Sequence, residues 1–176
     1  MDKLPNRKPT RWDLFDYNNQ GLYFLTICTK DRRNLLSHIS VGDGASTSRE
    51  NNTPTVTLTE IGKIVEKYIL STERIENVFV DKYVIMPNHI HLIVYVKEQR
   101  NIKNYVGTSR APSPTNKIIP HIVSTFKRFC NREIGENIFQ RSYYDHVIRD
   151  EEDYQTRATY IYENPMRWYY DELYNE

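Results

Sequence analysis

The sequence contains few of the features that mark a secreted or a membrane protein. Only two of its 176 residues are cysteines, Cys28 and Cys130, and they lie far apart without metal-ligand spacing. We interpret them as two reduced, partly buried thiols, because they indicate neither a disulfide framework nor a zinc site. No apolar run approaches the roughly 20 residues that a membrane-spanning helix needs. Residues 1–8 also lack the apolar stretch of a signal peptide, so we expect a cytoplasmic protein without membrane association.

The chain also lacks a strong net charge, and its balance of +1 at pH 7 argues against a globally basic nucleic-acid binder. The charges are nevertheless unevenly distributed. Residues 97–149 hold ten Lys or Arg against four Asp or Glu, whereas residues 150–176 hold two against eight. The basic middle could follow a phosphate backbone. Unevenly solvated faces of an ordinary neutral protein are the alternative.

Tyrosine is abundant, with 14 copies, of which eight lie between Tyr143 and Tyr174. Tyrosine rings can stack on unpaired bases, which suits the binding of single-stranded nucleic acid. They are equally common as half-buried core residues. Composition alone therefore does not separate these two roles.

The length of the chain allows one domain with a substantial core, and is too short for two ordinary domains. We predict a single domain over residues 1–176, with an N-terminal arm at 1–20, polar variable loops at 40–55 and 98–116, and a short C-terminal tail at 166–176.

Hydrophobic patterning predicts strands at 21–29, 56–58, 78–86, 89–97 and 139–148, and helices at 59–72, 117–132 and 150–164. Pro87 and Asn88 predict a tight turn between two of these strands, and Pro165 is predicted to end the last helix after Asn164. This order indicates an α+β fold with a mainly antiparallel central sheet flanked by helices.

A pair of histidines stands in the strand predicted at 89–97. Side chains alternate between the faces of a strand, so His89 and His91 project side by side while Ile90 points to the other face. Two imidazoles at this spacing can bind one divalent cation. Two partly exposed strand histidines are the alternative, and an isolated His-x-His motif does not decide between them.

The last predicted helix carries Tyr160 and Asn164, four residues apart and therefore one turn apart on the same face. A tyrosine hydroxyl beside an activated phosphate can attack phosphorus, and an amide oxygen is a suitable ligand for Mg²⁺ or Mn²⁺. A half-buried packing residue is the alternative role for Tyr160. No spacing rule selects it over the nearby tyrosines Tyr143, Tyr144, Tyr154 and Tyr162.

Four sequence blocks together resemble the REP-associated tyrosine transposases, which are relatives of the single-tyrosine HUH transposases of insertion sequences. The blocks are Asp16–Thr29, Leu58–Val65, Tyr83–Val94, and Phe139–Asp150 with its continuation at Tyr160–Pro165. They occur in order over most of the chain. The block around the Pro87–His91 segment is the most specific of them.

The resemblance implies a ferredoxin-like HUH fold in which His89, His91 and Asn164 bind Mg²⁺ or Mn²⁺ and Tyr160 is the nucleophile. It further implies single-stranded or hairpin DNA as the partner, cut and rejoined through a 5′-phosphotyrosine, by a monomer or a homodimer in the cytoplasm or on the nucleoid. Insertion-sequence relatives have glutamine where this chain has Asn164, so the asparagine agrees with the REP-associated branch.

DNA contacts are predicted only by region. The basic side chains that we expect to contact the DNA backbone are Lys117, Lys127, Arg128, Arg132 and Arg141.

Two other functions remain open at this point. A domesticated relative could hold hairpin DNA without transposing it, although the four predicted site residues are all present. A metal phosphoesterase without a covalent intermediate would use the histidines and leave Tyr160 without a role. A two-histidine-motif phosphodiesterase would need a second His-x-Ser/Thr motif, which the sequence does not contain.

Overall fold

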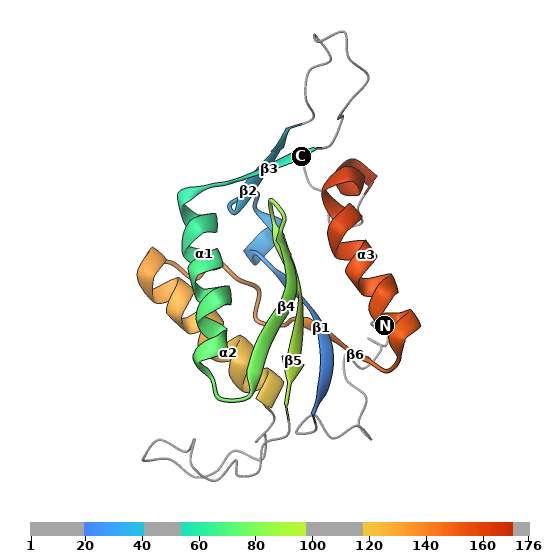
Figure 1. The fold of residues 1–176 in the computed structure, drawn as a ribbon. Coiled ribbons are helices and arrows are strands. Elements are labelled where there is room, and N and C mark those ends of the chain that lie inside the picture. The colour runs from blue at the N-terminus through green and yellow to red at the C-terminus, as the bar shows by residue number, and fades with distance from the viewer. Residues whose placement is uncertain (1–19, 41–53, 98–117, 171–176) are drawn as a thin grey trace, which may run out of the picture.

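The computed structural model describes residues 20–40, 54–97 and 118–170, and these residues form one α+β domain (Figure 1). The elements in chain order are β1 (Gly21–Cys28), β2 (Ser37–Ser40), β3 (Thr55–Leu58), α1 (Glu60–Ser71), β4 (Val78–Ile85), β5 (His89–Val96), α2 (Ile118–Ile134), β6 (Tyr144–Ile148) and α3 (Glu151–Arg167), with short 3-10 turns at Lys30–Arg32, Thr72–Arg74 and Trp168–Tyr170.

The main sheet has the strand order β4-β5-β1-β6, and every neighbouring pair is antiparallel. Helix α1 connects β1 to β4 by way of the small sheet, and α2 connects β5 to β6. A βαββαβ chain with this strand order has the ferredoxin-like topology. The predicted α+β domain with an antiparallel central sheet is confirmed.

The two faces of the sheet are covered differently. Helices α1 and α2 lie on one face, and α3 lies alone on the other (Figure 1). Alternation along β1 places Leu25 and Ile27 in the large core beneath α1 and α2, and Phe24 in a smaller core beneath α3. Strands β1 and β5 are central, so both of their faces are buried. This burial explains why their sequences are almost continuously apolar.

Strands β2 and β3 pair in a second, two-stranded sheet. The strand predicted at 56–58 is confirmed as β3, whereas β2 was not predicted from the sequence. The chain before it passes very close to α1. A Cβ atom on Gly62 would lie 1.9 Å from the carbonyl oxygen of Leu36. Only glycine permits this approach, and the Leu36 backbone in turn donates to the Pro87 carbonyl at 2.9 Å.

Helix α3 extends further than the sequence predicted. Pro165 lies inside it, the helix ends at Arg167, and a 3-10 turn continues to Tyr170. The prediction that the helix stops after Asn164 is therefore wrong. A proline removes one N–H and crowds the carbonyl four residues earlier, which near a helix end disturbs only one hydrogen bond. Burial of Trp168 holds the last turn against the sheet.

Strand β6 is shorter than the predicted strand at 139–148, because only Tyr144–Ile148 pair regularly and Phe139 forms a single bridge with Thr29.

Both cysteines are thiols, and burial raises the pKa of Cys130 to about 12. No helix in the described ranges is long and apolar enough to cross a membrane. The described residues leave out the predicted arm apart from Gln20, residues 41–53 of the first variable loop, all of the second loop at 98–116, and residues 171–176 of the predicted tail.

Candidate active site

Strand β5 begins with the two histidines, directly after the turn at Pro87 and Asn88. His89 is 0% exposed and His91 is 2% exposed, and their ring centroids are 4.5 Å apart. Both lie on the sheet face that α3 covers, as the alternation of the strand predicts. The two imidazoles are therefore a buried, adjacent pair, which differs from two partly exposed strand histidines.

Each imidazole is oriented through its Nδ1 atom. Nδ1 of His91 is 2.9 Å from Oγ1 of Thr26 on the neighbouring strand β1. Nδ1 of His89 is 2.8 Å from Oδ1 of Asn88, a residue that is itself 1% exposed. When Nδ1 carries the proton and donates it, Nε2 presents a lone pair. Hydrogen bonds of this kind fix the tautomer and ring orientation of metal-binding histidines.

The environment favours neutral imidazole. Burial, and secondarily the neighbouring His89, hold the pKa of His91 well below its ordinary value. A neutral imidazole is the form that binds a metal ion. Nε2 of His91 is buried and has no hydrogen-bond partner in the described part of the chain. A cation accepted by this atom would satisfy it.

Tyr160 of α3 lies across from this pair. Its ring centroid is 5.0 Å from that of His91, and both rings contact Phe24, at 6.1 Å and 5.3 Å. Eight residues further along the chain, in the 3-10 turn that continues α3, the ring centroid of Trp168 lies 5.9 Å from that of His89. Asn164 lies midway between them on that face and is 1% exposed, with a buried Oδ1. One stripe of α3 therefore faces both histidines.

Contacts with the sheet fix the first turns of α3. Asp150 caps the helix by accepting from the Asp153 N–H at 2.8 Å. The Asp153 carboxylate pairs with His146 of β6 at 2.7 Å and with Arg157 at 3.2 Å. Arg157 in turn lies 5.5 Å from the Phe24 ring centroid. This chain of contacts leads from the start of α3 to the ring that touches both His91 and Tyr160.

The residues present fit a divalent cation. Two imidazoles with Nδ1 already engaged and a buried amide oxygen on the facing helix form a mixed nitrogen and oxygen donor set. Within the described ranges, no group of three or more His, Cys, Asp or Glu side chains is placed to hold a metal. A third protein donor would then have to be a group of another kind, such as the buried amide oxygen of Asn164.

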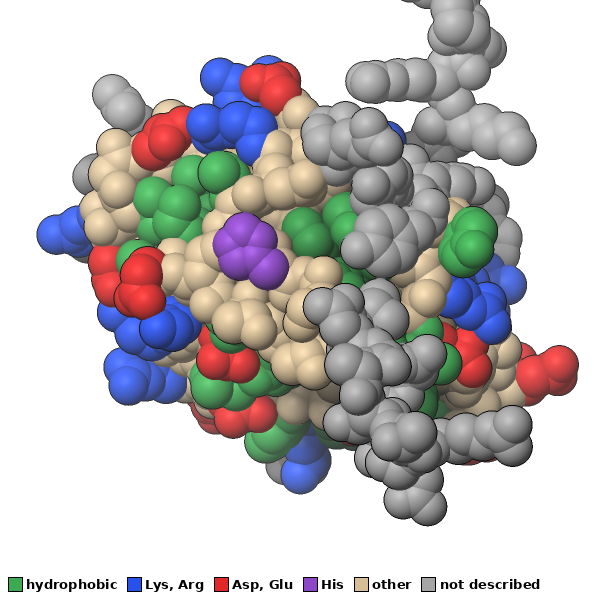
Figure 2. Space-filling view, turned by 90° about the horizontal axis from the view of Figure 1, so that it is seen from above, with side chains coloured by type: hydrophobic (Ala, Val, Ile, Leu, Met, Phe, Trp, Pro, Cys, Tyr) green, Lys and Arg blue, Asp and Glu red, His purple; other side chains and the backbone are tan. Residues whose placement is uncertain are grey.

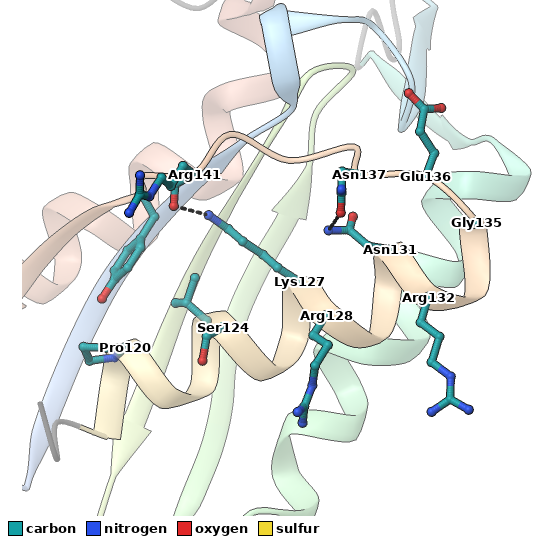
Figure 3. Close-up of a pocket in the computed structure, with 12 residues that line it drawn as sticks. Pro120, Ser124, Lys127, Arg128, Asn131, Arg132, Gly135, Glu136, Asn137 and Arg141 are labelled. Carbon is teal, nitrogen blue, oxygen red and sulfur yellow. Dashed lines mark hydrogen bonds between the residues drawn. The ribbon is translucent and has the colours of Figure 1, made fainter. Parts of the chain in front are cut away.

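The predicted DNA-contacting residues gather in one place. Lys127, Arg128, Arg132 and Arg141 all line a groove of about 700 Å³ between α2 and the segment that leads to β6 (Figure 3). Lys117 lies outside the described residues. The ammonium of Lys127 donates to the carbonyls of Gln140 at 2.8 Å and Ser142 at 3.0 Å, so it stabilises the groove wall.

Sequence reasoning did not identify the residues that orient this site. Thr26, Phe24 and Trp168 each contact one of the histidines. Phe24 and Thr26 lie in the first of the four sequence blocks, but nothing in that block pointed to these contacts. Their role depends on strand register, in which Thr26 pairs with His91 and Cys28 with His89. An antiparallel register between the strands at 21–29 and 89–97 would have been the signal for Thr26.

Comparisons with known proteins extend these observations. No family model matches the chain. An uncharacterized protein of Haemophilus influenzae is 32% identical over 186 residues, which cover 97% of this chain and 94% of that protein. A second protein of the same organism, predicted to be a REP-associated tyrosine transposase, is 26% identical and covers 90% of this chain and 77% of its own length.

A solved structure shares the fold. It is a REP-associated tyrosine transposase bound to a REP hairpin, with a TM-score of 0.55 and 20% identity, and the match covers 84% of this chain and 67% of that one. Similarity therefore extends over most of the chain in both sequence and fold. The chain is therefore a distant relative of the REP-associated tyrosine transposases in sequence, and it shares the fold of the solved one.

Proposed function

We propose that this protein cuts and rejoins single-stranded DNA in a metal-dependent reaction that passes through a covalent bond to Tyr160. The observation that carries this proposal is the position of the Tyr160 ring, 5.0 Å from His91 across the boundary between α3 and the sheet. Tyr160 packs edge-on against the buried histidine pair from the facing helix. In a phosphoesterase without a covalent intermediate, a tyrosine at this position would have no chemical role.

His89, His91 and Asn164 would hold the cation, which we propose to be Mg²⁺ or Mn²⁺. When bound, it supplies Lewis-acid polarisation of a phosphodiester. Asn88 and Thr26 hold the imidazole rings in the orientation that directs Nε2 towards the cation. Phe24 and Trp168 pack against the same rings and exclude water from their far sides.

The chemical step is a transesterification. The Tyr160 phenol loses its proton, its oxygen attacks phosphorus, and the bond between phosphorus and the 3′ oxygen breaks. The 3′ oxygen leaves and takes up a proton, so the products are a 5′-phosphotyrosine and a free 3′-OH. One phosphoester replaces another, and no external energy source is consumed. A 3′-OH from a second strand can reverse the step and complete strand transfer.

We propose hairpin or repeat DNA as the substrate class. The solved relative described above is bound to a REP hairpin, and the basic groove on α2 offers cationic side chains for a DNA backbone. The protein would act as a monomer or a homodimer.

The test uses labelled hairpin DNA with Mn²⁺, followed by denaturing electrophoresis. We expect a covalent protein–DNA band that disappears in Tyr160→Phe and in His89→Ala. Tyr162→Phe is the matched control, because Tyr162 lies on the same helix but is 77% exposed, so its band should persist. Binding to several hairpins with no band would favour a domesticated hairpin-binding protein. Cleavage that survives Tyr160→Phe would contradict the assignment of the nucleophile.

A further inference from the structure

Arg157 is a half-buried cation on α3, about one turn before Tyr160. The two residues are three positions apart, so their side chains are neighbours on the same face of the helix. The guanidinium carbon of Arg157 lies 5.5 Å from the centroid of the Phe24 ring, and the centroid of the Tyr160 ring lies 6.1 Å from it. Arg157 therefore lies beside the proposed nucleophile and is not among the proposed metal ligands.

The Phe24 ring connects this cation with the histidine pair. Phe24 stacks against the imidazole of His91, with 5.3 Å between ring centroids and 20° between ring planes. One aromatic ring therefore contacts a proposed metal ligand, the proposed nucleophile and a guanidinium group. These three kinds of group are those that a reaction at a phosphodiester requires around it.

The guanidinium of Arg157 is held from one side, and its outer end remains available. Nε donates to the Asp153 carboxylate at 3.2 Å, and that carboxylate is also 2.7 Å from Nε2 of His146 on β6. Burial raises the pKa of the Asp153 carboxyl, but its interactions with His146 and Arg157 outweigh burial and hold that pKa below its ordinary value. Within the described ranges, the terminal nitrogens of Arg157 have no hydrogen-bond partner. The end of the guanidinium that can bind an anion with two parallel N–H donors is therefore unoccupied by protein.

Other basic side chains are less well placed for the reacting phosphate. Those of α2 lie on the opposite face of the sheet from α3 (Figure 1). On the face seen from above, acidic and basic side chains are mixed around the rim, without a broad basic area among the coloured atoms (Figure 2). Arg157 shares the helix of Tyr160, and its side chain is 30% exposed. A half-buried cation attracts an anion more strongly than a fully exposed one, because less water screens it.

We infer that Arg157 is a catalytic residue whose guanidinium binds the scissile phosphate. This inference rests on the proposed function. As the Tyr160 oxygen adds to phosphorus, negative charge increases on the nonbridging oxygens of the phosphate. The terminal nitrogens of Arg157 donate hydrogen bonds to one of these oxygens, keep their protons and form no covalent bond. Donors that are already oriented towards developing charge lower the barrier without a cost of reorganisation.

The alternative role for Arg157 is structural, as a contact that fastens α3 to the sheet through Asp153 and Phe24. A structural contact would affect the reaction in the same way whatever the charge of the DNA at the reacting phosphorus. A methylphosphonate separates the two roles, because a methyl group replaces one nonbridging oxygen and the linkage is uncharged. A guanidinium that stabilises charge on that oxygen has no function with such a substrate.

The first experiment compares single-turnover rate constants for covalent attachment of a labelled hairpin with an unpaired flank. The length of the released fragment identifies the cleaved phosphate, and a second DNA carries a methylphosphonate there, with its two diastereomers tested separately. Arg157→Ala should be slower than the wild type by about 100-fold on the phosphodiester. On one methylphosphonate diastereomer the two proteins should react at similar rates. Equal slowing on the phosphodiester and on both diastereomers would overturn the inference and leave Arg157 a structural contact.

Arg167→Ala is the matched control, because Arg167 also lies on α3 and pairs with an acid one turn away, Glu163 at 2.6 Å, but its side chain is 66% exposed. This variant should react like the wild type on every DNA, and a loss equal to that of Arg157→Ala would contradict a specific role for Arg157. Arg157→Lys keeps the charge without the planar pair of donors, so it should recover part of the rate on the phosphodiester.

A second experiment measures binding alone and separates this inference from the proposed function. In Tyr160→Phe, a single methylphosphonate is moved through the unpaired flank, and fluorescence anisotropy gives each affinity. At one position the methylphosphonate should weaken binding, and the further change Arg157→Ala should remove that difference. If no position behaves in this way, the inference is overturned, even where the wild type forms a covalent band. Such a position without a covalent band from the wild type would retain the phosphate site at Arg157 and reject Tyr160 as the nucleophile.

Discussion

At the scale of single residues, the two imidazoles are oriented by different kinds of neighbour. His89 uses the adjacent Asn88, which also forms the hairpin turn, whereas His91 uses Thr26 from another strand. The Asn88 contact cannot be removed without altering the turn. The Thr26 hydroxyl can be removed with little change of shape, so it offers the cleaner test of how orientation affects metal binding.

We predict that Thr26→Val weakens metal binding by roughly 10- to 100-fold, the usual cost of losing a hydrogen bond to a metal-binding histidine. Isothermal titration of the protein with Mn²⁺ measures the affinity. Thr57→Val, at an exposed position of β3, is the control and should bind the metal like the wild type. Equal affinity in the Thr26 variant would mean that packing by Phe24 alone orients His91.

Lys127 gives a prediction on pH. Burial lowers the pKa of Lys127 from the ordinary 10.5 to about 8, against a smaller raising effect of the electrostatic interaction with Cys28. Between pH 8 and 10.5 the unfolded chain therefore binds more protons at this residue than the folded chain does. Stability contributed by Lys127 rises with pH across that window. Urea denaturation measures the unfolding free energies of the wild type and of Lys127→Met. The wild-type value minus the Lys127→Met value should increase from pH 7.5 to pH 9.5. A constant difference would contradict the lowered pKa.

Some of the candidate site residues can be placed from local sequence rules, and others cannot. Strand alternation was sufficient to place His89 and His91 side by side, because a period of two is a local property. No local rule selects Tyr160, and only its family resemblance did so. Its packing against His91 depends on how α3 crosses the sheet, which involves residues more than 60 positions apart. Its proposed role as nucleophile remains a prediction.

At the scale of elements, α3 is the part whose placement matters for the proposed chemistry. It contacts β6 through Asp153, β1 through Arg157 and β5 through Tyr160, and the 3-10 turn that follows it adds the contact of Trp168 with β5. The pair between Asp153 and His146 anchors the end of the helix that is farthest from the histidine pair. Loss of this ion pair should therefore alter the orientation of α3 on the sheet and leave the proposed metal ligands in place.

We predict that Asp153→Asn slows covalent attachment of DNA and leaves the Mn²⁺ affinity unchanged, because it loosens the helix and touches no proposed ligand. The rate constant of the single-turnover reaction is the measurement, with metal affinity measured in parallel. His146→Gln should slow attachment similarly, and the two changes together should cost little more than either alone. Additive losses would show that the residues act separately, and a matching loss of metal affinity would indicate general destabilisation.

Gly62 gives a stability prediction for α1. A methyl group at this position would lie 1.9 Å from the Leu36 carbonyl oxygen, which is backbone and cannot rotate away. Gly62→Ala should therefore destabilise the fold by a few kcal/mol, even though alanine ordinarily favours a helix by about 1 kcal/mol over glycine. The urea midpoint is the measurement, and a stabilised variant would show that the Leu36 segment can move.

The elements differ in how well sequence predicts them. The β4–β5 hairpin and α1 are confirmed because both combine a clear apolar period with a turn or a capping residue, Thr59 in the case of α1. Strand β2 was missed because its four residues, with buried Ser37, carry no apolar alternation and depend on pairing with β3. The end of α3 was misplaced because burial of Trp168 outweighs the effect of Pro165.

At the scale of the whole molecule, the two cores are unequal. Among the residues that the structure describes, twenty buried side chains form the core beneath α1 and α2, and five form the core beneath α3. Regions with few buried apolar contacts open at a lower free-energy cost than the rest of a domain. Helix α3 is therefore the layer held less tightly, and a ligand that bridges α3 and the sheet should stabilise it most.

This difference leads to a prediction about metal addition and removal. A cation held by His89 and His91 on the sheet and by Asn164 on α3 binds the folded chain alone. At 100 times its dissociation constant, it should raise the unfolding free energy by about 2.7 kcal/mol. Thermal unfolding with and without Mn²⁺ should show an increase of several degrees, which EDTA reverses. His89→Ala with His91→Ala should abolish the increase, and His38→Ala, at an exposed position of β2, should not.

Hydrogen exchange locates the effect: Mn²⁺ should slow exchange in α3 more than in α1. Equal slowing in both helices would mean that the metal binds without joining α3 to the sheet.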